Sequence, residues 1–163
     1  MVNEIVEVFV GFLESNNIPT EIIPFIISLF PVLELRGGMI AAYILGVPFV
    51  KAFIVCFIGN MLPIPFILLF IRKIFALMKK SKALSKIVEK MEKRAEKKQG
   101  TMLKYKEWGL LLFVAIPLPG TGGWTGALIA ALMDLRIKKC LPIIAIGVFI
   151  AGLIMSFVTY GIF

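Results

Sequence analysis

A break rich in glycine and proline interrupts an apolar stretch of this chain at residues 117–124, PLPGTGGW. Proline removes a backbone donor and glycine costs roughly 1 kcal/mol relative to alanine, so neither is favoured inside a helix. A weaker break occupies residues 31–38, PVLELRGG. Non-helical backbone survives in lipid only where protein buries it or where it lines a wet cavity. The two breaks therefore predict a functional site inside the membrane.

Composition sets the class of protein. Hydrophobic residues make up 60% of the 163 positions, compared with roughly 45–50% in soluble domains. We therefore predict an all-α integral membrane protein with a single domain. Histidine is absent, which removes the commonest metal ligand and general base, so no metal or other cofactor is expected. Cys56 and Cys140 lie in apolar runs and are predicted to be buried thiols.

The two breaks have similar flanks. Glu21 and Glu107 each stand ten residues before the first proline of a break, an offset of 86. After the breaks, small residues recur at every fourth position with an offset of 84: Gly38, Ala42 and Gly46, then Gly122, Gly126 and Ala130. This spacing lets another helix approach closely. We predict an internal repeat, with coincidence between two Gly/Pro-rich segments as the alternative.

The first apolar arm, from Glu21 to Leu33, is too short to cross a bilayer. A crossing needs about 20 residues, and continuing straight on would place Glu34 and Arg36 at mid-membrane at about 2.5–3.5 kcal/mol each. We predict a re-entrant hairpin that turns at Gly37–Gly38 and leaves through residues 39–47. A second hairpin is predicted to enter through residues 107–118, turn at residues 120–123 and leave through residues up to 133.

Two uncharged stretches, 52–71 and 140–163, are predicted to be spanning helices. Asn60, Pro63 and Pro65 lie in the middle of the first, which predicts a kink there. Asn60 is expected either to face the cavity or to hold neighbouring helices together. Gly147 and Ala151 in the second have the spacing of a homodimer face, although packing within one chain explains them equally.

Charge is concentrated in residues 72–106, which carry 13 basic and 3 acidic residues. Apolar residues recur there with helical spacing, so we predict a basic amphipathic helix, cytoplasmic by the positive-inside rule. It could rest on anionic lipid headgroups. Nucleic-acid binding is not expected, because base-stacking aromatics are lacking. Residues 1–18 lack the basic start of a signal peptide and predict an acidic amphipathic helix at the membrane interface.

These predictions combine into one membrane domain over residues 1–163. It consists of the interfacial helix at 1–18, a first repeat at 20–71, the basic segment at 72–106 and a second repeat at 107–163. Counting crossings from a cytoplasmic basic segment makes the first hairpin enter from outside and the second from the cytoplasm. We therefore predict an inverted-topology repeat, as in many secondary transporters, in a multi-pass protein of the plasma membrane.

Three blocks, PVLELRGGMIAAYILG, IGNMLPIPF and AIPLPGTGGWTGALIAAL, resemble those of the prokaryotic small multidrug export protein family. That family is distantly similar to the DedA (VTT-domain) membrane proteins, which are built on opposed re-entrant hairpins and associated with lipid-carrier transport and scrambling. The resemblance covers residues 21–163. It implies a functional centre formed by five residues: Glu34, Arg36, Pro117, Pro119 and Gly120. Asn60, Thr121 and Trp124 are expected beside this centre.

Glu34 and Arg36 are expected to be either a fixed pair at the hairpin tip or a switch. If Arg36 moved toward an anionic substrate, Glu34 would lose its partner and could take up a proton. Residues 120–123 are interpreted as a backbone nest for a phosphate or carboxylate, or simply as a tight turn. Trp124 would stack on a ligand or pack. The candidate site comprises Glu34, Arg36, Gly37, Gly38, Asn60, Pro117, Pro119, Gly120, Thr121, Gly122, Gly123 and Trp124.

Three functions are compatible with these features. The favoured one is a transporter or flippase for an amphiphilic, anionic substrate such as a lipid phosphate or a drug-like molecule, driven by proton or ion coupling. An enzyme acting on lipid phosphates is the second, although the chain has no histidine and no evident nucleophile pair. A membrane scaffold that binds anionic lipid or a partner through the basic helix is the third. We expect no enzymatic activity.

Overall fold

The computed structural model describes residues 2–80, 85–86, 88–90, 93, 108–118, 120–133 and 135–161. Regular structure in these ranges is α-helical throughout, which confirms the all-α part of the predicted fold class. The elements are α1 (Val2–Ser15), α2 (Ile23–Leu29), α3 (Glu34–Ile44), α4 (Phe49–Met61), α5 (Ile64–Met78), a helix at 108–115, α7 (Gly123–Leu132) and α8 (Ile137–Tyr160).

The predicted N-terminal helix is present as α1, and its apolar residues divide into two stripes. Val6, Val10 and Leu13 are buried in a cluster with residues of α2 and α3. A second stripe, which includes Val8 and Phe12, is exposed at 71% and 65%. One stripe thus docks α1 on the first hairpin, and the other leaves an apolar surface. The position of α1 at a membrane interface stays a prediction.

The first hairpin turns earlier than predicted. The chain leaves the helical conformation between α2 and α3, at residues 30–33, and Gly37 and Gly38 lie inside α3. The prediction of a turn at the glycine pair was therefore wrong. A Cβ on Gly38 would lie 1.9 Å from Ser28 Oγ and 2.8 Å from the Pro24 carbonyl oxygen. Gly38 is needed because α2 and α3 pack closely. A glycine pair at a close helix contact looks the same in the sequence as a glycine pair at a turn.

The second break has the predicted form. The helix at 108–115 ends before an irregular segment, and α7 begins at Gly123 after Gly120 and Gly122 adopt φ angles of +78° and +124°. α7 ends at Leu132 with Met133 as its C-cap, where the exit arm was predicted to end. Pro119 lies outside the described residues.

Two segments, Phe49–Ile71 and Ile137–Tyr160, are long and apolar enough to cross a membrane. The first is interrupted as predicted, because α4 ends at Met61 and α5 begins at Ile64 after Pro63. At 1.5 Å per residue, the 23 and 24 residues reach about 35 Å, more than the roughly 30 Å of a hydrocarbon core. α5 continues to Met78, into the predicted basic segment. Most of that segment lies outside the described residues, so its amphipathic helix stays a prediction.

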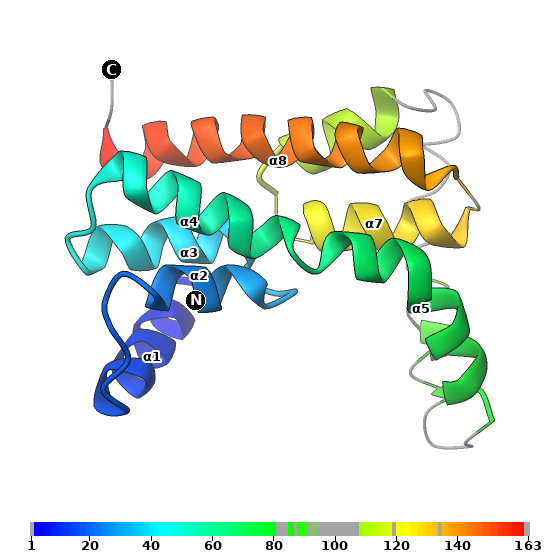
Figure 1. The fold of residues 1–163 in the computed structure, drawn as a ribbon, viewed down its shortest axis with the longest axis horizontal. Coiled ribbons are helices and arrows are strands. Elements are labelled where there is room, and N and C mark those ends of the chain that lie inside the picture. The colour runs from blue at the N-terminus through cyan, green and yellow to red at the C-terminus, as the bar shows by residue number, and fades with distance from the viewer. Residues whose placement is uncertain are drawn as a thin grey trace.

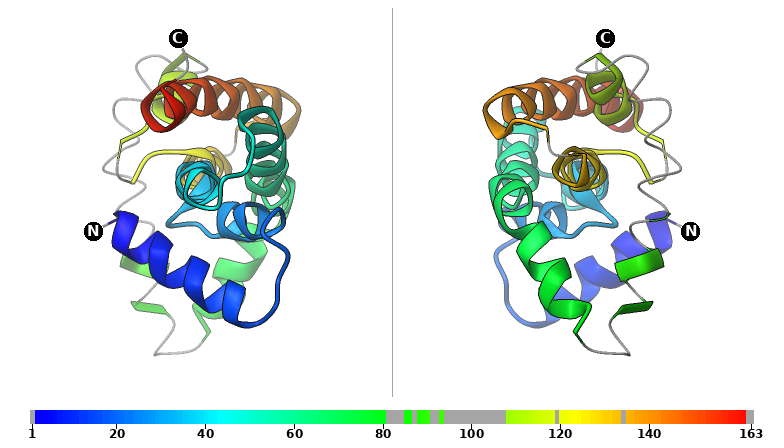
Figure 2. Two further views of the ribbon diagram at one scale, coloured as in Figure 1. Left: turned by 90° about the vertical axis from the view of Figure 1, so that its left-hand side faces the viewer. Right: turned by 90° about the vertical axis from the view of Figure 1, so that its right-hand side faces the viewer.

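The short helices α3 and α7 lie nearly end to end with their N-terminal ends facing each other (Figure 1). Viewed along the long axis they overlap almost completely, and α8 runs beside them (Figure 2). Each short helix is followed by a four-residue link and a long apolar segment, with starts offset by 123 − 34 = 89 and 137 − 49 = 88 residues. The two halves share this order of elements, and the internal repeat itself stays a prediction. Its inversion across a bilayer stays a prediction.

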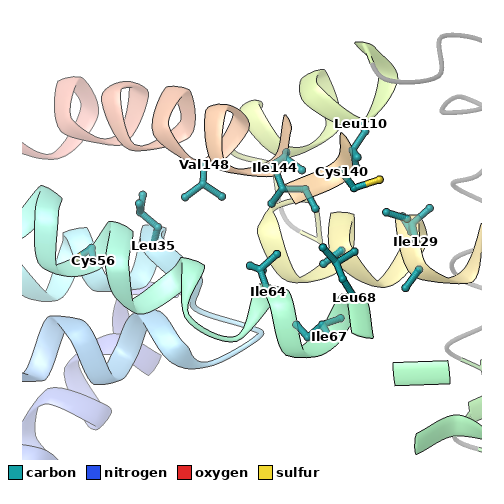
Figure 3. Packing of buried hydrophobic residues seen from close by; sticks show 14 of the residues in the cluster. Leu35, Cys56, Ile64, Ile67, Leu68, Leu110, Ile129, Cys140, Ile144 and Val148 are labelled. Atoms are coloured by element: carbon teal, nitrogen blue, oxygen red, sulfur yellow. The ribbon is translucent and has the colours of Figure 1, made fainter. Parts of the chain in front are cut away.

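The larger apolar core joins both halves of the chain. It contains buried side chains from α3, α4, α5, the helix at 108–115, α7 and α8 (Figure 3), including Leu35, Ile64, Leu110, Ile129 and Val148. Burying a side chain of this size stabilises by about 1.5–3 kcal/mol. Both predicted buried thiols, Cys56 and Cys140, belong to this core.

Small residues let the helix at 108–115 approach α7 and α8. A Cβ on Gly126 would lie 2.5 Å from Val114 Cγ2, and one on Gly147 would lie 2.8 Å from the same side chain. Gly147 is therefore used in packing within the chain, one of the two alternatives that the sequence left open.

This contact gives a first prediction. Gly126→Ala should lower the free energy of unfolding by about 2 kcal/mol, because the added methyl group overpacks against Val114. In a Val114→Ala background the space is free, so the same substitution should cost much less, with a coupling of about 1–2 kcal/mol. A double-mutant cycle from denaturant unfolding in detergent micelles measures this coupling. Additive effects would contradict the prediction.

Candidate functional site

The N-terminus of α7 lies midway along both long apolar segments. A Cβ on Gly123 would lie 3.1 Å from Val148 Cγ2, 3.4 Å from Ile64 Cδ1 and 3.5 Å from Asn60 Nδ2. Asn60 is residue 12 of the 23 in Phe49–Ile71, and Val148 is residue 12 of the 24 in Ile137–Tyr160. The facing ends of α3 and α7 therefore meet at the centre of the molecule's long axis (Figure 1).

Glu34 occupies this centre. Its side chain is only 5% exposed, and its carboxylate accepts hydrogen bonds from the backbone N–H groups of Gly123 (3.1 Å) and Trp124 (3.2 Å). Helix N-termini carry a partial positive charge. Glu34 lies in the first turn of α3 and also contacts the N-terminus of α7. One carboxylate thus neutralises two facing helix ends. The φ angle of Glu34 is +51°, a conformation that costs a non-glycine residue about 1–3 kcal/mol.

Gly122 makes the approach of this carboxylate possible. Its φ angle is +124°, and a Cβ at this position would lie 2.0 Å from Glu34 Oε2. Any side chain here would therefore displace the carboxylate as well as strain the backbone. The tight turn is therefore present, and the carboxylate held beside it is the side chain of Glu34. A backbone nest that binds a phosphate or carboxylate ligand stays a prediction.

Arg36 makes a second link between the two breaks. Its guanidinium donates hydrogen bonds from Nη1 to the Leu118 carbonyl and from Nη2 to the Thr121 carbonyl (3.1 Å) and Thr121 Oγ1 (2.9 Å). These carbonyls belong to irregular backbone, which needs partners when it is buried away from water. The guanidinium fork can satisfy several acceptors at once. Glu34 and Arg36 therefore both bind the second break, and we call these hydrogen bonds between the two tips the cross-link. Whether the two residues act as a fixed pair or as a switch stays open.

Thr121 holds the irregular segment together. Its Oγ1 lies 2.8 Å from the carbonyl oxygens of Ile116 and Leu118, and accepts a hydrogen bond from the Leu118 N–H (3.2 Å). Thr121 thus holds the carbonyl groups of the irregular segment in place for Arg36, and its own hydroxyl group also binds Arg36.

Thr121→Val should therefore lower the free energy of unfolding by about 1–2 kcal/mol, because it removes these hydrogen bonds while keeping the shape of the side chain. Thr121→Ser keeps the hydroxyl group and should cost less than half as much. Denaturant unfolding of the two variants in the same detergent measures the difference. Equal losses would mean that the methyl group, and not the hydroxyl group, is what stabilises the segment.

Two buried polar atoms beside the cross-link have no hydrogen-bond partner among the described residues. They are Asn60 Oδ1 and Trp124 Nε1. Asn60 is 1% exposed and is the predicted polar residue of the kinked span. A buried polar group without a partner costs about 1–3 kcal/mol, so Asn60 next to Gly123 marks unused hydrogen-bonding capacity at the centre of the molecule.

Most of the predicted site residues come together at this centre: Glu34, Arg36, Asn60, Thr121, Gly122, Gly123 and Trp124. Gly37 and Gly38 instead serve the packing of α3. Pro117 and Gly120 belong to the irregular segment, and Gly120 is exposed. Leu118 and Ile116 were not predicted as site residues, because they act through backbone carbonyls that any residue possesses.

Two long apolar helical segments and a polar cross-link at their midpoint place this chain among the all-α membrane proteins. The chain belongs to the family described as putative small multi-drug export protein, whose model matches residues 34–154. This confirms the family resemblance expected from the three blocks, and the match begins at Glu34 and includes every described residue of the cross-link. A search of curated proteins and a search of solved structures gave no match.

Proposed function

We propose that this protein is a membrane transporter or flippase for an amphiphilic, anionic substrate, a lipid phosphate or a drug-like molecule. The supporting observation is the cross-link in which Glu34 binds the N-terminus of α7 and Arg36 binds the segment before it, midway along both apolar segments. In many transporters, interrupted helices place their positive N-termini at the midplane, where they bind anionic substrate groups. The family name, which refers to export, also supports transport.

The proposed topology follows the sequence. The hairpin formed by α2 and α3 enters the bilayer from outside, and the hairpin formed by the helix at 108–115 and α7 enters from the cytoplasm. A distant similarity to the DedA proteins, which the sequence blocks led us to expect, is part of this proposal, and it would bring with it two opposed re-entrant hairpins. Residues 72–106 are then cytoplasmic, in the plasma membrane, where their positive charge favours anionic headgroups.

The proposed cycle opens and closes the contacts between the two hairpin tips. An anionic substrate that attracts Arg36 would release the carbonyls of Leu118 and Thr121 and let the two hairpins separate. Glu34 would then lose its neighbouring positive charge and take up a proton more readily. Substrate and proton movement are coupled in this scheme.

Flux of fluorescent phosphatidic acid between the leaflets of proteoliposomes tests the proposal. Glu34→Gln and Arg36→Ala should each lower the protein-dependent rate by at least about tenfold, since each removes one half of the cross-link. Glu21→Gln is the matched control, because Glu21 is a carboxylate of the same hairpin that pairs at the surface with Lys51 (3.2 Å). The hydrogen bond from Lys51 lowers the pKa of Glu21. This control should transport at the rate of the unchanged protein.

Other outcomes would favour the other function classes. Release of inorganic phosphate from phosphatidic acid would replace transport with a lipid-phosphate enzyme. Neither flux nor phosphate release, together with binding to anionic vesicles that is lost when the lysines of the basic segment are neutralised, would indicate a scaffold. A rate equal in empty and protein-containing vesicles, for phosphatidic acid and for a panel of cationic drugs, would contradict the proposed function.

A further inference from the structure

The N-terminal end of α7 forms a cradle around one carboxylate. The N–H groups of Gly123 and Trp124 donate to the two oxygens of Glu34, and Gly122 leaves room for them because it has no side chain. α7 is 10 residues long, enough for the N-terminal partial charge to favour an anion. The cradle therefore binds an oxyanion, which in this structure belongs to the protein itself.

Hydrogen-bonding capacity beside the cradle exceeds what Glu34 uses. Asn60 Oδ1 is a buried acceptor without a partner in the part of the chain that is described. Asn60 is 1% exposed, and its Nδ2 lies 3.5 Å from where a Cβ of Gly123 would be. A headgroup that carries both an oxyanion and a hydroxyl group would supply an acceptor for the two N–H groups of the cradle and a donor for Asn60 Oδ1.

Charge at the cradle also favours an anionic ligand. Arg36 is the one charged side chain whose charge acts on Glu34 among the described residues. α4, α5 and α8 bring uncharged side chains next to Gly123, namely those of Asn60, Ile64 and Val148. An anion that replaced the Glu34 carboxylate would therefore meet two backbone donors and a guanidinium, without a second acidic side chain to repel it.

We propose that the cradle at the start of α7 is the headgroup site for the substrate, and that Glu34 competes with the substrate for it as an internal carboxylate. The headgroup is an oxyanion that also carries a hydroxyl group, such as a singly protonated phosphonate or phosphate monoester. This inference rests on the proposed function in treating the bound anion as cargo. When the substrate headgroup replaces the Glu34 carboxylate in the cradle, Glu34 is released, so substrate binding and release of Glu34 occur together.

Binding of small amphiphiles to the full chain in detergent micelles tests the competition. The probe is octanesulfonate, which stays a monoanion, at about neutral pH. The emission of Trp124 reports binding in a Trp108→Phe background, since the chain has two tryptophans and Trp108 is 71% exposed. Glu34→Gln removes the negative competitor and should tighten binding about tenfold or more. Glu34→Gly, which suits the positive φ, should do the same and guards against misfolding of the first variant.

A matched pair of ligands tests the hydroxyl group. At about pH 5.5, octylphosphonate is a monoanion with one P–OH group and octanesulfonate is a monoanion without one. Octylphosphonate should bind about fivefold more tightly, the equivalent of one neutral hydrogen bond of about 1 kcal/mol. Asn60→Leu should abolish this preference while keeping the binding of octanesulfonate. Octanol at the same concentration controls for partition into the micelle.

The outcomes separate this inference from the proposed function. Tighter binding in both Glu34 variants supports the headgroup site even if the proteoliposomes show no flux. Unchanged or weaker binding in both variants, with helical content retained by circular dichroism, overturns it even if flux is present. If sulfate binds at least about tenfold more weakly than octanesulfonate, the ligand of the cradle is an amphiphile. If the two bind equally, the ligand is a free oxyanion, and the amphiphile part of the inference is overturned.

Discussion

Gly38→Ala should lower the free energy of unfolding by about 3 kcal/mol and disturb the first hairpin. The added methyl group would lie 1.9 Å from Ser28 Oγ, 2.8 Å from the Pro24 carbonyl oxygen and 2.9 Å from Cys56 Sγ. Rotation of a side chain relieves the first contact, but the second is with backbone and cannot be relieved in this way. α3 must therefore move away from α2 and α4, and with it the cross-link that Glu34 and Arg36 make.

Gly11→Ala provides the control for this substitution. Gly11 is also inside a helix, and a Cβ there would have no neighbour within 4 Å. The same change should stabilise α1 by up to about 1 kcal/mol, because alanine favours a helix over glycine. Denaturant unfolding of both variants in one detergent measures the difference in sign. A loss below about 1 kcal/mol for Gly38→Ala would show that α2 and α3 separate easily and would contradict the close packing.

Double variants show which contact of the added methyl group on residue 38 destabilises the protein. In a Ser28→Ala background the nearest contact of the added methyl group is gone, whereas the contact with the Pro24 carbonyl remains. Gly38→Ala should therefore still cost about 1–2 kcal/mol in that background. The hydrogen bond from Ser28 Oγ to the Pro24 carbonyl (2.7 Å) is lost in both members of the comparison. Its own contribution to stability therefore cancels.

The sequence predicted the elements of this fold well where hydrophobic length determines them. The two long apolar segments, the interruption near Pro63 and the short helix after the second break all follow from apolar run lengths and from proline. These signals are local, because a helix of given length either spans about 30 Å or does not. The family expected from the three sequence blocks was also confirmed, over residues 34–154.

The turn of the first hairpin was misplaced because glycine has two uses. The prediction took Gly37 and Gly38 as the turn, whereas the chain turns at residues 30–33 and Gly38 faces Ser28 across a helix contact. The position that adopts a positive φ there is Glu34, a residue that rarely does so. Its conformation is compensated by bonds to Gly123 and Trp124, about 90 residues away. No local pattern contains that information.

The candidate site was predicted in its residues but not in its connections. Intramembrane charge and interrupted helices singled out Glu34, Arg36 and the glycines of the second break. The expectation was that the two charges would form either a fixed pair or a switch at one hairpin tip. In the structure Glu34 accepts from N–H groups at the start of α7, and Arg36 donates to carbonyl groups of the irregular segment before it. These backbone groups, and not the opposite charge nearby, provide their hydrogen-bond partners.

Arg36→Leu should destabilise the protein by about 3 kcal/mol or more. The substitution removes the hydrogen bonds to Leu118 and Thr121 and leaves the buried Glu34 carboxylate without its neighbouring positive charge. Arg36→Lys keeps the charge but has no fork to bind several acceptors, so it should lose about 1–2 kcal/mol. Unfolding in detergent by denaturant, followed by circular dichroism, measures both.

A double-mutant cycle separates the two parts of the Arg36 effect. Glu34→Gln should cost about 1–2 kcal/mol in the unchanged protein, because it weakens two hydrogen bonds from helix N–H groups. In the Arg36→Leu background it should cost almost nothing or restore stability, because it also removes an uncompensated buried charge. A coupling of at least about 1 kcal/mol is therefore expected. Additive losses would mean that Arg36 stabilises only the irregular segment, and that the two charges do not act on each other as the proposed coupling requires.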